Sequence, residues 1–329
     1  MKTYHRKRQS PYGQSGEWLG EYLVDYARRT YAPQKVTHRA GPFDKDGVPL
    51  FDIRAFYLSG DPVYHPINII QYALAHYHLW LDGVSESHDK YMTCARWLEE
   101  NAVPYAGGRF LAWPYPFPLK WYGVPPGWIS GMAQCQAVSV LARAYQSSGS
   151  EKTEQVLHGA INCLRYDTNE GGVIARMPDR GPFIEEVCHY PYLHILNGFL
   201  YSIFGLYEYL QLFRDEELAE LLSACVTCVE RSLPDYDTGW WSRYSTGMRW
   251  HLAKPSYHWT HVHQLRGLAG LFGNSVFNEY ADRWERYAEK ALNRRRLTVT
   301  KFLHSCINYA CTRLRLEAVK NSNLAKIGC

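Results

Sequence analysis

Residues 244–265, YSTGMRWHLAKPSYHWTHVHQL, bring together side chains that can move protons. Tyr244 and Tyr257 stand on either side of a loop that carries the cations Arg249 and Lys254. The Pro-Ser before Tyr257 predicts a helix start, with Tyr257 in a first turn whose N–H groups and dipole favour a phenolate. The ordinary pKa of a phenol is about 10, which makes tyrosine an unusual acid or base. It suits one task, which is proton transfer at carbon in a positively charged, water-poor pocket.

Four further sequence blocks follow one another in a fixed order. They are GWISGMAQCQAVSVLARAY (127–145), the pair Glu185-Glu186 with LNGFLYSIFGLYEYL (196–210), PDYDTG (234–239) and YHWTHVHQL (257–265). Together with YHPINIIQYALAHY (64–77), they resemble the C-terminal catalytic domain of the D-glucuronyl C5-epimerases, the heparan- and heparosan-type uronate epimerases. The resemblance covers residues 64–265 and implies that D-glucuronate is converted to L-iduronate within an acidic polysaccharide or glycoconjugate, without a cofactor.

The resemblance also implies the catalytic residues. Tyr257 would be one C5 acid/base, and Glu186 would act on the other face or on the substrate carboxylate. Tyr244 would hydrogen-bond a glycosidic or carboxylate oxygen, or serve as the second base. The structural alternatives are a Tyr257 ring packed beneath Trp259, a Glu186 salt bridge on a strand, and a Tyr244 ring at a hairpin edge.

The sequence departs from the family at two points. The animal enzymes have a tyrosine directly after the paired glutamates, whereas this chain has Val187. His189 and Tyr190 are the candidate replacements; on a regular strand His189 shares the face of Val187 and is favoured. The segment before residue 64 is also too short for the family's upstream β-rich region and membrane anchor.

The remaining candidates would bind substrate. Arg249 and Lys254 would hold the carboxylate or remain solvated charges, and Asn197 would bind a hydroxyl or cap a helix. Other residues would line sugar subsites or form hydrogen bonds near them: Trp113, Trp128, Gln134, His258 and His261. The two histidines share a helix face, but no carboxylate with ligand spacing accompanies them, so we expect no metal.

Composition limits the other functions. A net charge of +4 is compatible with an acidic glycan but too small to indicate nucleic-acid binding. No nucleotide-binding or acyl-enzyme motif occurs, so we expect no cofactor. Nine cysteines, an odd number, predict buried thiols in a reducing, cytoplasmic location. We find neither a transmembrane segment nor a signal peptide, and the sequence leaves a homodimer open.

Apolar spacing predicts a mainly α fold, an incomplete (α/α) toroid of helical hairpins with short β-hairpins at one rim. First helices are expected near residues 64, 127, 195 and 257, and second helices near 86, 151, 215 and 278, a repeat of about 62–68 residues. The predicted β-hairpins lie at 109–122, 171–187 and 239–244. The expected parts are an N-terminal extension (1–63) with a packing helix at 17–31, a catalytic toroid (64–292) and a basic helix or tail (293–329).

Three other functions compete with epimerisation. A polysaccharide lyase would begin with the same C5 proton abstraction and then lose the C4 substituent. A glycoside hydrolase needs two carboxylates about 5–10 Å apart, whereas Glu185 and Glu186 are sequence neighbours whose side chains diverge on a strand. A non-catalytic glycan-binding protein is the third alternative, because Val187 replaces a family tyrosine.

Overall fold

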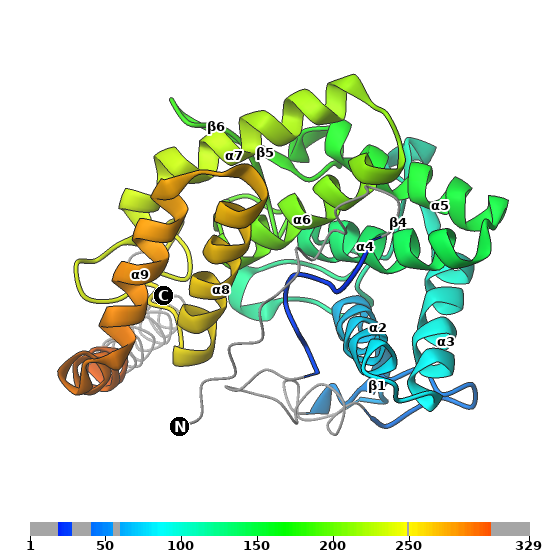
Figure 1. Cartoon of the computed structure of the whole chain (residues 1–329), viewed down its shortest axis with the longest axis horizontal. Coiled ribbons are helices and arrows are strands. Elements are labelled where there is room, and N and C mark those ends of the chain that lie inside the picture. The colour runs from blue at the N-terminus through cyan, green and yellow to red at the C-terminus, as the bar shows by residue number, and fades with distance from the viewer. Residues whose placement is uncertain (1–18, 28–40, 55–59, 249, 304–329) are drawn as a thin grey trace, which may run out of the picture.

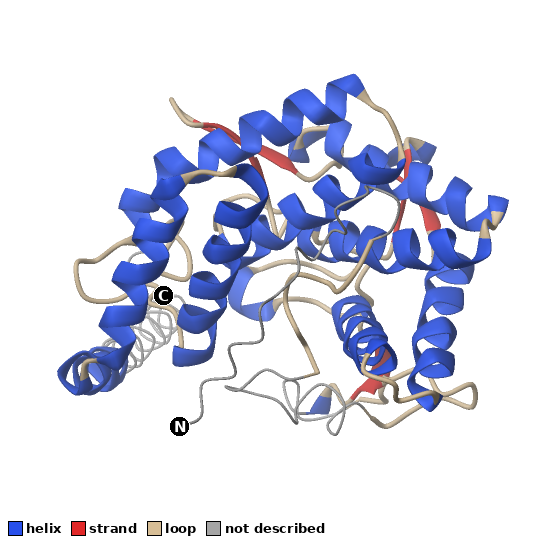
Figure 2. Cartoon of the chain, in the orientation of Figure 1, coloured by secondary structure: helices blue, strands red, loops and turns tan. Residues whose placement is uncertain are grey.

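The computed structural model describes residues 19–27, 41–54, 60–248 and 250–303, and most of them are helical (Figures 1 and 2). The long helices form four consecutive pairs: α2 (Pro66–Leu81) with α3 (Glu86–Asn101), α4 (Gly131–Ser148) with α5 (Glu151–Ile161), α6 (Leu196–Leu212) with α7 (Glu216–Tyr236), and α8 (Pro255–Phe272) with α9 (Ser275–Glu289). These bounds confirm the eight predicted helix starts to within a few residues. Closure of the pairs into a toroid remains a prediction.

Local signals explain why the helices begin where they do. Ser130 and Ser150 cap α4 and α5 by accepting hydrogen bonds from the backbone N–H groups of Ala133 and Thr153. Asp215 caps α7 in the same way, through Leu218. Proline occupies the first turn of α2 and of α8, where its missing N–H group has no helical partner to lose.

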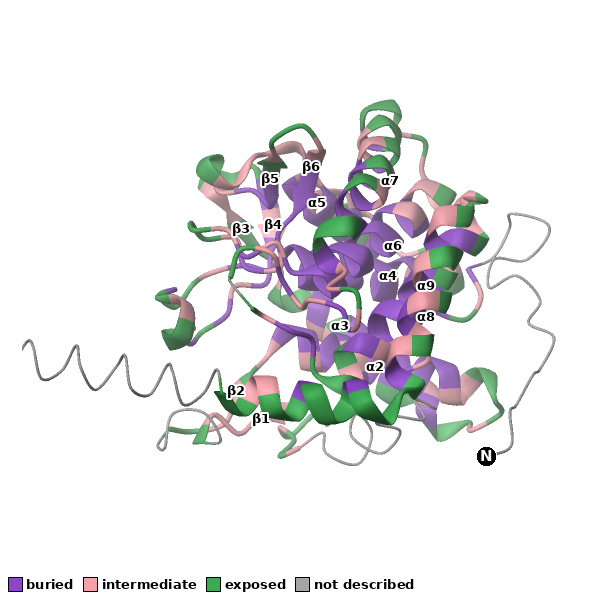
Figure 3. Ribbon diagram, turned by 90° about the vertical axis from the view of Figure 1, so that its left-hand side faces the viewer, coloured by how far each residue is buried: buried purple, intermediate pink, exposed green. Residues whose placement is uncertain are grey.

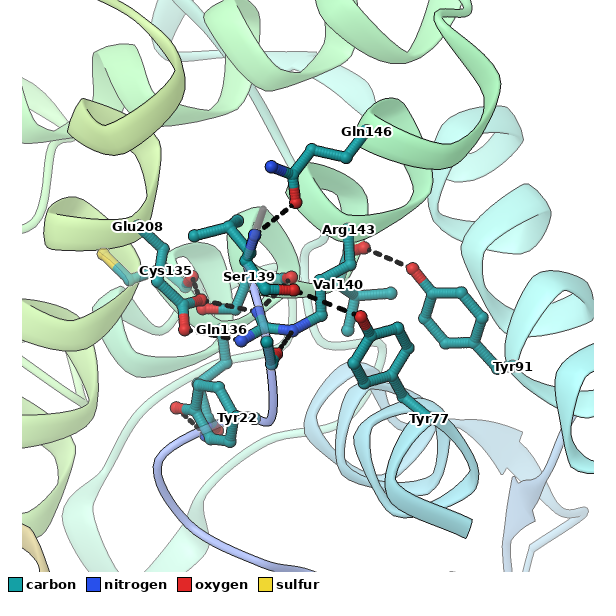
Figure 4. Close-up of polar contacts among 12 residues, drawn as sticks. Tyr22, Tyr77, Tyr91, Cys135, Gln136, Ser139, Val140, Arg143, Gln146 and Glu208 are labelled. Atoms are coloured by element: carbon teal, nitrogen blue, oxygen red, sulfur yellow. Dashed lines mark hydrogen bonds and ion pairs between the residues drawn. The ribbon is translucent and has the colours of Figure 1, made fainter. Parts of the chain in front are cut away.

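Helices α4 and α6 form the centre of the core. They are the most completely buried helices in Figure 3, and they pack closely because Gly205 lacks a side chain. A Cβ atom at Gly205 would lie 2.0 Å from the backbone oxygen of Cys135. The same interface contains a buried ion pair in which Arg143 donates to both carboxylate oxygens of Glu208 at 2.7 Å (Figure 4). Removing either partner would leave an uncompensated buried charge.

The N-terminal segment 19–27 is not helical, so the helix predicted at 17–31 is wrong for the described part of that range. The segment is instead buried against the core helices. Its backbone accepts hydrogen bonds from Arg143 at Gly20 and from Tyr77 at Leu19 (Figure 4), and Leu23 approaches α8 at Gly267. Long-range contacts outweigh helix propensity here, because the backbone polar groups find partners on α2 and α4.

Three short antiparallel strand pairs connect the helices. They are β1 (Leu50–Phe51) with β2 (Val63–Tyr64), β3 (Val103–Tyr105) with β4 (Phe110–Ala112), and β5 (Ile174–Met177) with β6 (Gly181–Ile184). The β5–β6 pair confirms the hairpin predicted at 171–187. Within 109–122, however, only β4 is a strand, and its partner β3 precedes that range. Residues 239–244 contribute isolated bridges instead of a hairpin.

The C-terminal helix begins earlier than predicted. Residues 291–303 are helical, and the rest of the basic helix or tail predicted at 293–329 lies outside the described residues. Three consecutive arginines at 294–296 belong to this helix: Arg294 donates to the carbonyls of Ala288 and Glu289, and Arg296 lies 4.2 Å from the centre of the Trp240 ring. None of the helices in the described ranges is both long and apolar enough to cross a bilayer.

Candidate functional site

The structure brings Glu186, Tyr244 and Tyr257 together from three separate segments. Glu186 follows β6, Tyr244 lies in the loop between α7 and α8, and Tyr257 is in the first turn of α8. The Tyr244 side chain interacts with both other side chains, and its ring centroid is 4.8 Å from that of Tyr257. Three groups that can exchange protons therefore form one connected cluster, which we call the acid/base cluster.

Backbone contacts fix the position of Glu186. The N–H group of Gly131 donates to the carbonyl of Glu185 at 2.9 Å, and the N–H group of Glu185 donates to Val173 at 2.9 Å. Gly131 permits this approach, since a Cβ atom there would lie 2.6 Å from the Glu185 oxygen. The start of α4 therefore supports the strand end that carries Glu186.

The two adjacent glutamates, which follow β6, have different surroundings. Glu185 is fully buried and forms an ion pair with His194 at 2.5 Å, while its other oxygen accepts the His194 backbone N–H at 3.2 Å. His194 has a φ of 49°, a conformation unusual for a residue with a side chain, and Tyr236 donates to its carbonyl at 2.7 Å. Glu185 thus holds a strained loop in place.

Glu186 has the most unusual carboxyl group of the cluster. Its pKa is raised to about 8, chiefly by burial and also by the nearby Glu185 charge, while the interaction with Tyr244 lowers it. Its Oε2 atom is shielded from solvent and has no hydrogen-bond partner among the described residues. A carboxyl group with this pKa is mostly protonated at neutral pH, so it can donate a proton as well as accept one.

The two tyrosines differ in accessibility. Tyr244 is partly buried, and burial raises its pKa well above the ordinary value, with further contributions from the charges of Glu186 and Tyr257. Its backbone is held on both sides, because its carbonyl accepts from Leu196 and its N–H donates to His251. Tyr257 is 37% exposed and begins the helix as predicted. Tyr257 is therefore the more exposed of the two phenols.

The loop that precedes Tyr257 contains exposed cationic and aromatic residues. Lys254 is the exposed residue directly before α8. Trp250 is 51% exposed, and His251 is hydrogen-bonded to Ser245 at 2.7 Å. Arg249 lies outside the described residues, so its predicted contact with a carboxylate stays a prediction.

Several predicted substrate-binding residues are structural instead. Trp113 and Gln134 are buried: the Gln134 side chain accepts from the Trp113 backbone at 3.2 Å and donates to Leu111 at 2.9 Å. Trp128 stacks on Tyr115 at 3.9 Å between ring centroids. These contacts position the segment before α4, so the expectation that Trp113 and Gln134 line an open sugar subsite is wrong.

His258 and His261 also have structural surroundings. Both are fully buried, and each ring has its Nδ1 atom within hydrogen-bonding distance of the Ser242 hydroxyl, at 2.7 and 3.1 Å. Burial lowers both pKa values, to about 4 for His258. The two histidines share a helix face as predicted, but that face packs against Ser242 and Trp284 and does not meet solvent.

Asn197, His189 and Tyr190 do not enter the acid/base cluster in the expected way. Asn197 is buried in the first turn of α6 and does not cap that helix, whose N-cap is Ile195. His189 is exposed, and Tyr190 is 76% exposed. The expectation that one of the latter two replaces the family tyrosine finds no support in their placement.

Two aromatic residues that the sequence reasoning missed lie near the cluster. The Glu186 charge raises the pKa of both Tyr115 and Tyr122, although burial is the larger cause for each. Both belong to the stretch PYPFPLKWYGVPPGW. The only signal in the sequence was the Pro- and aromatic-rich composition of this stretch, which does not show which ring turns inward.

No group of residues in the described ranges has the arrangement of a metal site. The six cysteines in these ranges are free thiols, and Cys225 and Cys228 are buried within α7. A groove of about 630 Å³ lies apart from the acid/base cluster, between the β5–β6 hairpin and α7. Its arginines Arg176 and Arg180 are paired with Asp167 and Asp235, so it is a weaker candidate for acid/base chemistry.

Comparison with known proteins identifies the family of the chain. The family model described as D-glucuronyl C5-epimerase C-terminus matches residues 107–286, a range that includes the acid/base cluster. A D-glucuronyl C5-epimerase of Caenorhabditis elegans is 37% identical over 187 residues, which cover 50% of this chain and 29% of that protein. An uncharacterized protein of Methanocaldococcus jannaschii is 24% identical over 182 residues, 53% of this chain and 57% of that protein. The matches thus span less than two thirds of either relative.

Proposed function

Because the chain belongs to the D-glucuronyl C5-epimerase C-terminus family, we propose that it inverts C5 of D-glucuronate residues in a polysaccharide or glycoconjugate. The product would be L-iduronate, and the reaction would need no cofactor. The observation that carries this proposal is the contact of Tyr244 with both Glu186 and Tyr257. It connects an accessible phenol to a buried carboxyl group through a second phenol.

Inversion at C5 requires a base on one face of the sugar and an acid on the other. Tyr257 is our candidate on the accessible face, where the first turn of α8 stabilises a phenolate. Glu186 is our candidate acid for the opposite face, because its raised pKa keeps it protonated at neutral pH. Tyr244 joins the two groups and would return each to its starting protonation state after turnover.

Charge on the substrate carboxylate grows as the C5 proton leaves. Electrostatic stabilisation of that charge must supply much of the rate, since acid/base positioning alone contributes roughly 10²–10⁴-fold. Lys254, exposed directly before α8, is our candidate cation in the described part of the loop. We further propose that the four helix pairs form an incomplete toroid whose rim presents these residues to a chain of sugars.

The proposal is tested by incubating the protein with heparosan and related uronate polymers in D₂O. We expect NMR to show deuterium at C5 together with new L-iduronate signals. Absorbance of an unsaturated uronate without iduronate would instead identify a lyase. Binding of a polymer with neither exchange nor cleavage would identify a non-catalytic glycan-binding protein.

A further inference from the structure

Val187, the residue directly after the paired glutamates, is a buried apolar side chain and adds no acid or base to the acid/base cluster. Val187 is only 4% exposed and packs with Val124, Leu193 and Ile195 in a small apolar group. A side chain at position 187 therefore helps to build the wall of the site. Any phenol that supplements Tyr244 and Tyr257 has to come from another segment.

Tyr122 is the phenol that lies against this wall. Its ring and that of Tyr244 both pack on the apolar group that contains Val187. Tyr122 is half-buried, in contrast to the outward Tyr190. Two tyrosines from distant parts of the sequence thus contact one small surface beside Glu186.

A tight turn fixes the backbone at Tyr122. Leu119 and Val124 exchange backbone hydrogen bonds at 2.8 and 3.2 Å, and the Tyr122 N–H donates to Leu119 at 3.0 Å. Gly123 has a φ of 69°, the left-handed conformation that ends the short helix η2 (Lys120–Tyr122). This closed loop holds the backbone from which the Tyr122 side chain extends, as a preorganised donor requires.

Tyr122 lies near enough to Glu186 and Tyr244 for their charges to interact. The charge of Glu186 raises the pKa of Tyr122, and the charge of Tyr122 contributes to the raised pKa of Tyr244. Burial acts in the same direction and is the larger cause for both tyrosines. Tyr122 therefore keeps its proton at neutral pH and can act as a hydrogen-bond donor beside the two groups.

We propose that Tyr122 is a further catalytic residue, which donates a hydrogen bond to the uronate carboxylate while the C5 proton is away. This inference rests on the proposed function. When C5 loses its proton, the electron pair moves onto the carboxylate, and a neutral donor fixed beside it stabilises that charge more than it stabilises the ground state. Tyr122 would thus provide a third phenol from a different loop of the fold.

The test is the Tyr122→Phe variant of the full chain, assayed for C5 deuterium exchange and iduronate formation. Loss of one positioned donor typically costs 10²–10³-fold in kcat. We expect a loss of that size, with KM and the thermal midpoint nearly unchanged. Tyr145→Phe is the matched control, because Tyr145 is also half-buried but lies on α4 with its hydroxyl on Glu154; it should keep wild-type kcat.

Each outcome decides the inference. If the wild type is active and a folded Tyr122→Phe keeps more than about a tenth of its kcat, the role of Tyr122 is wrong while the proposed function stands. A damaging Tyr190→Phe beside a silent Tyr122→Phe would assign the role to Tyr190. A wild type without C5 exchange on any uronate polymer contradicts the proposed function itself. If Tyr122→Phe does not fold, Tyr122→His and Tyr122→Leu are compared: a folded His variant at least tenfold more active than a folded Leu variant supports the donor role, and equal kcat in the two overturns it.

Discussion

Gly198, in the first turn of α6, leaves open the space that the Glu186 side chain occupies. A Cβ atom at Gly198 would lie 2.4 Å from Oε2 and 2.6 Å from Cβ of Glu186. A Cβ atom essentially never lies this close to a non-bonded heavy atom, so any larger residue must displace the carboxyl group. The glycine of the LNGF segment and the second glutamate of the pair therefore form one structural unit.

Gly198→Ala should consequently impair catalysis. We expect a loss of at least tenfold in kcat, and a destabilisation of roughly 1–3 kcal/mol from overpacking. Gly270→Ala is the control, because Gly270 lies on α8 with no atom within 4 Å of its would-be Cβ. That change should keep full activity and stabilise by about 1 kcal/mol through helix propensity. Rate assays and urea unfolding of both variants would check this, and equal activity of the two would refute the steric account.

Tyr257→Phe should abolish turnover and leave folding and glycan affinity nearly intact. The substitution removes the proton-carrying hydroxyl but little buried area, since Tyr257 is 37% exposed. A catalytic acid/base is worth 10²-fold or more. Steady-state kinetics and glycan titration are the measurements, with Tyr280→Phe on α9 as the control. Retention of more than about a tenth of wild-type kcat would contradict the assignment.

The raised pKa of Glu186 predicts a specific dependence of stability on pH. Its folded pKa of about 8 exceeds the ordinary value of 4.5, so the unfolded chain releases this proton at lower pH than the folded chain does. The contribution of Glu186 to the free energy of unfolding therefore falls as the pH rises from about 4.5 to about 8.

Glu186→Gln removes that contribution. We expect the variant to gain stability relative to wild type as the pH is raised from 5 to 8, although its activity is lost. Urea unfolding of both proteins at several pH values measures the difference. The comparison is needed because the buried His65 and His258, whose pKa values are lowered to about 4, act with the opposite sign in both proteins. A constant difference between pH 5 and 8 would mean that Glu186 has an ordinary pKa.

Lys254→Ala should reduce rate far more than affinity. The carboxylate charge that this cation neutralises grows in the transition state, so its loss lowers kcat with a smaller change in substrate binding. Kinetics with a uronate polymer, together with direct binding of the same polymer, separate the two effects. Equal losses in both quantities, or no loss, would place Lys254 on the solvated surface.

The buried pair of Arg143 and Glu208 should control stability without touching the site. Arg143→Met leaves the Glu208 carboxylate without its cation, so we expect a loss of about 3–5 kcal/mol in the free energy of unfolding. The double variant Arg143→Met with Glu208→Leu should recover much of that loss. Denaturant unfolding measures all three proteins, and an additive double variant would contradict the coupling.

The sequence by itself determined the features that depend on neighbouring residues. Apolar periodicity and caps such as Ser130 and Asp215 specify helix starts within a few residues, because a cap bonds to N–H groups in the same turn. The Tyr257 position at a helix start followed from the preceding proline.

Only the tertiary structure decided which side chains meet. His258 and His261 have the composition of a binding site, yet α8 packs them against Ser242, and no local signal reveals which helix face is covered. Segment 19–27 is not helical because its polar groups find partners on helices distant in sequence. Tyr122 lies beside Glu186 only because two loops more than sixty residues apart pack on the same apolar group. Such contacts depend on the packing of the whole chain, which periodicity and spacing do not specify.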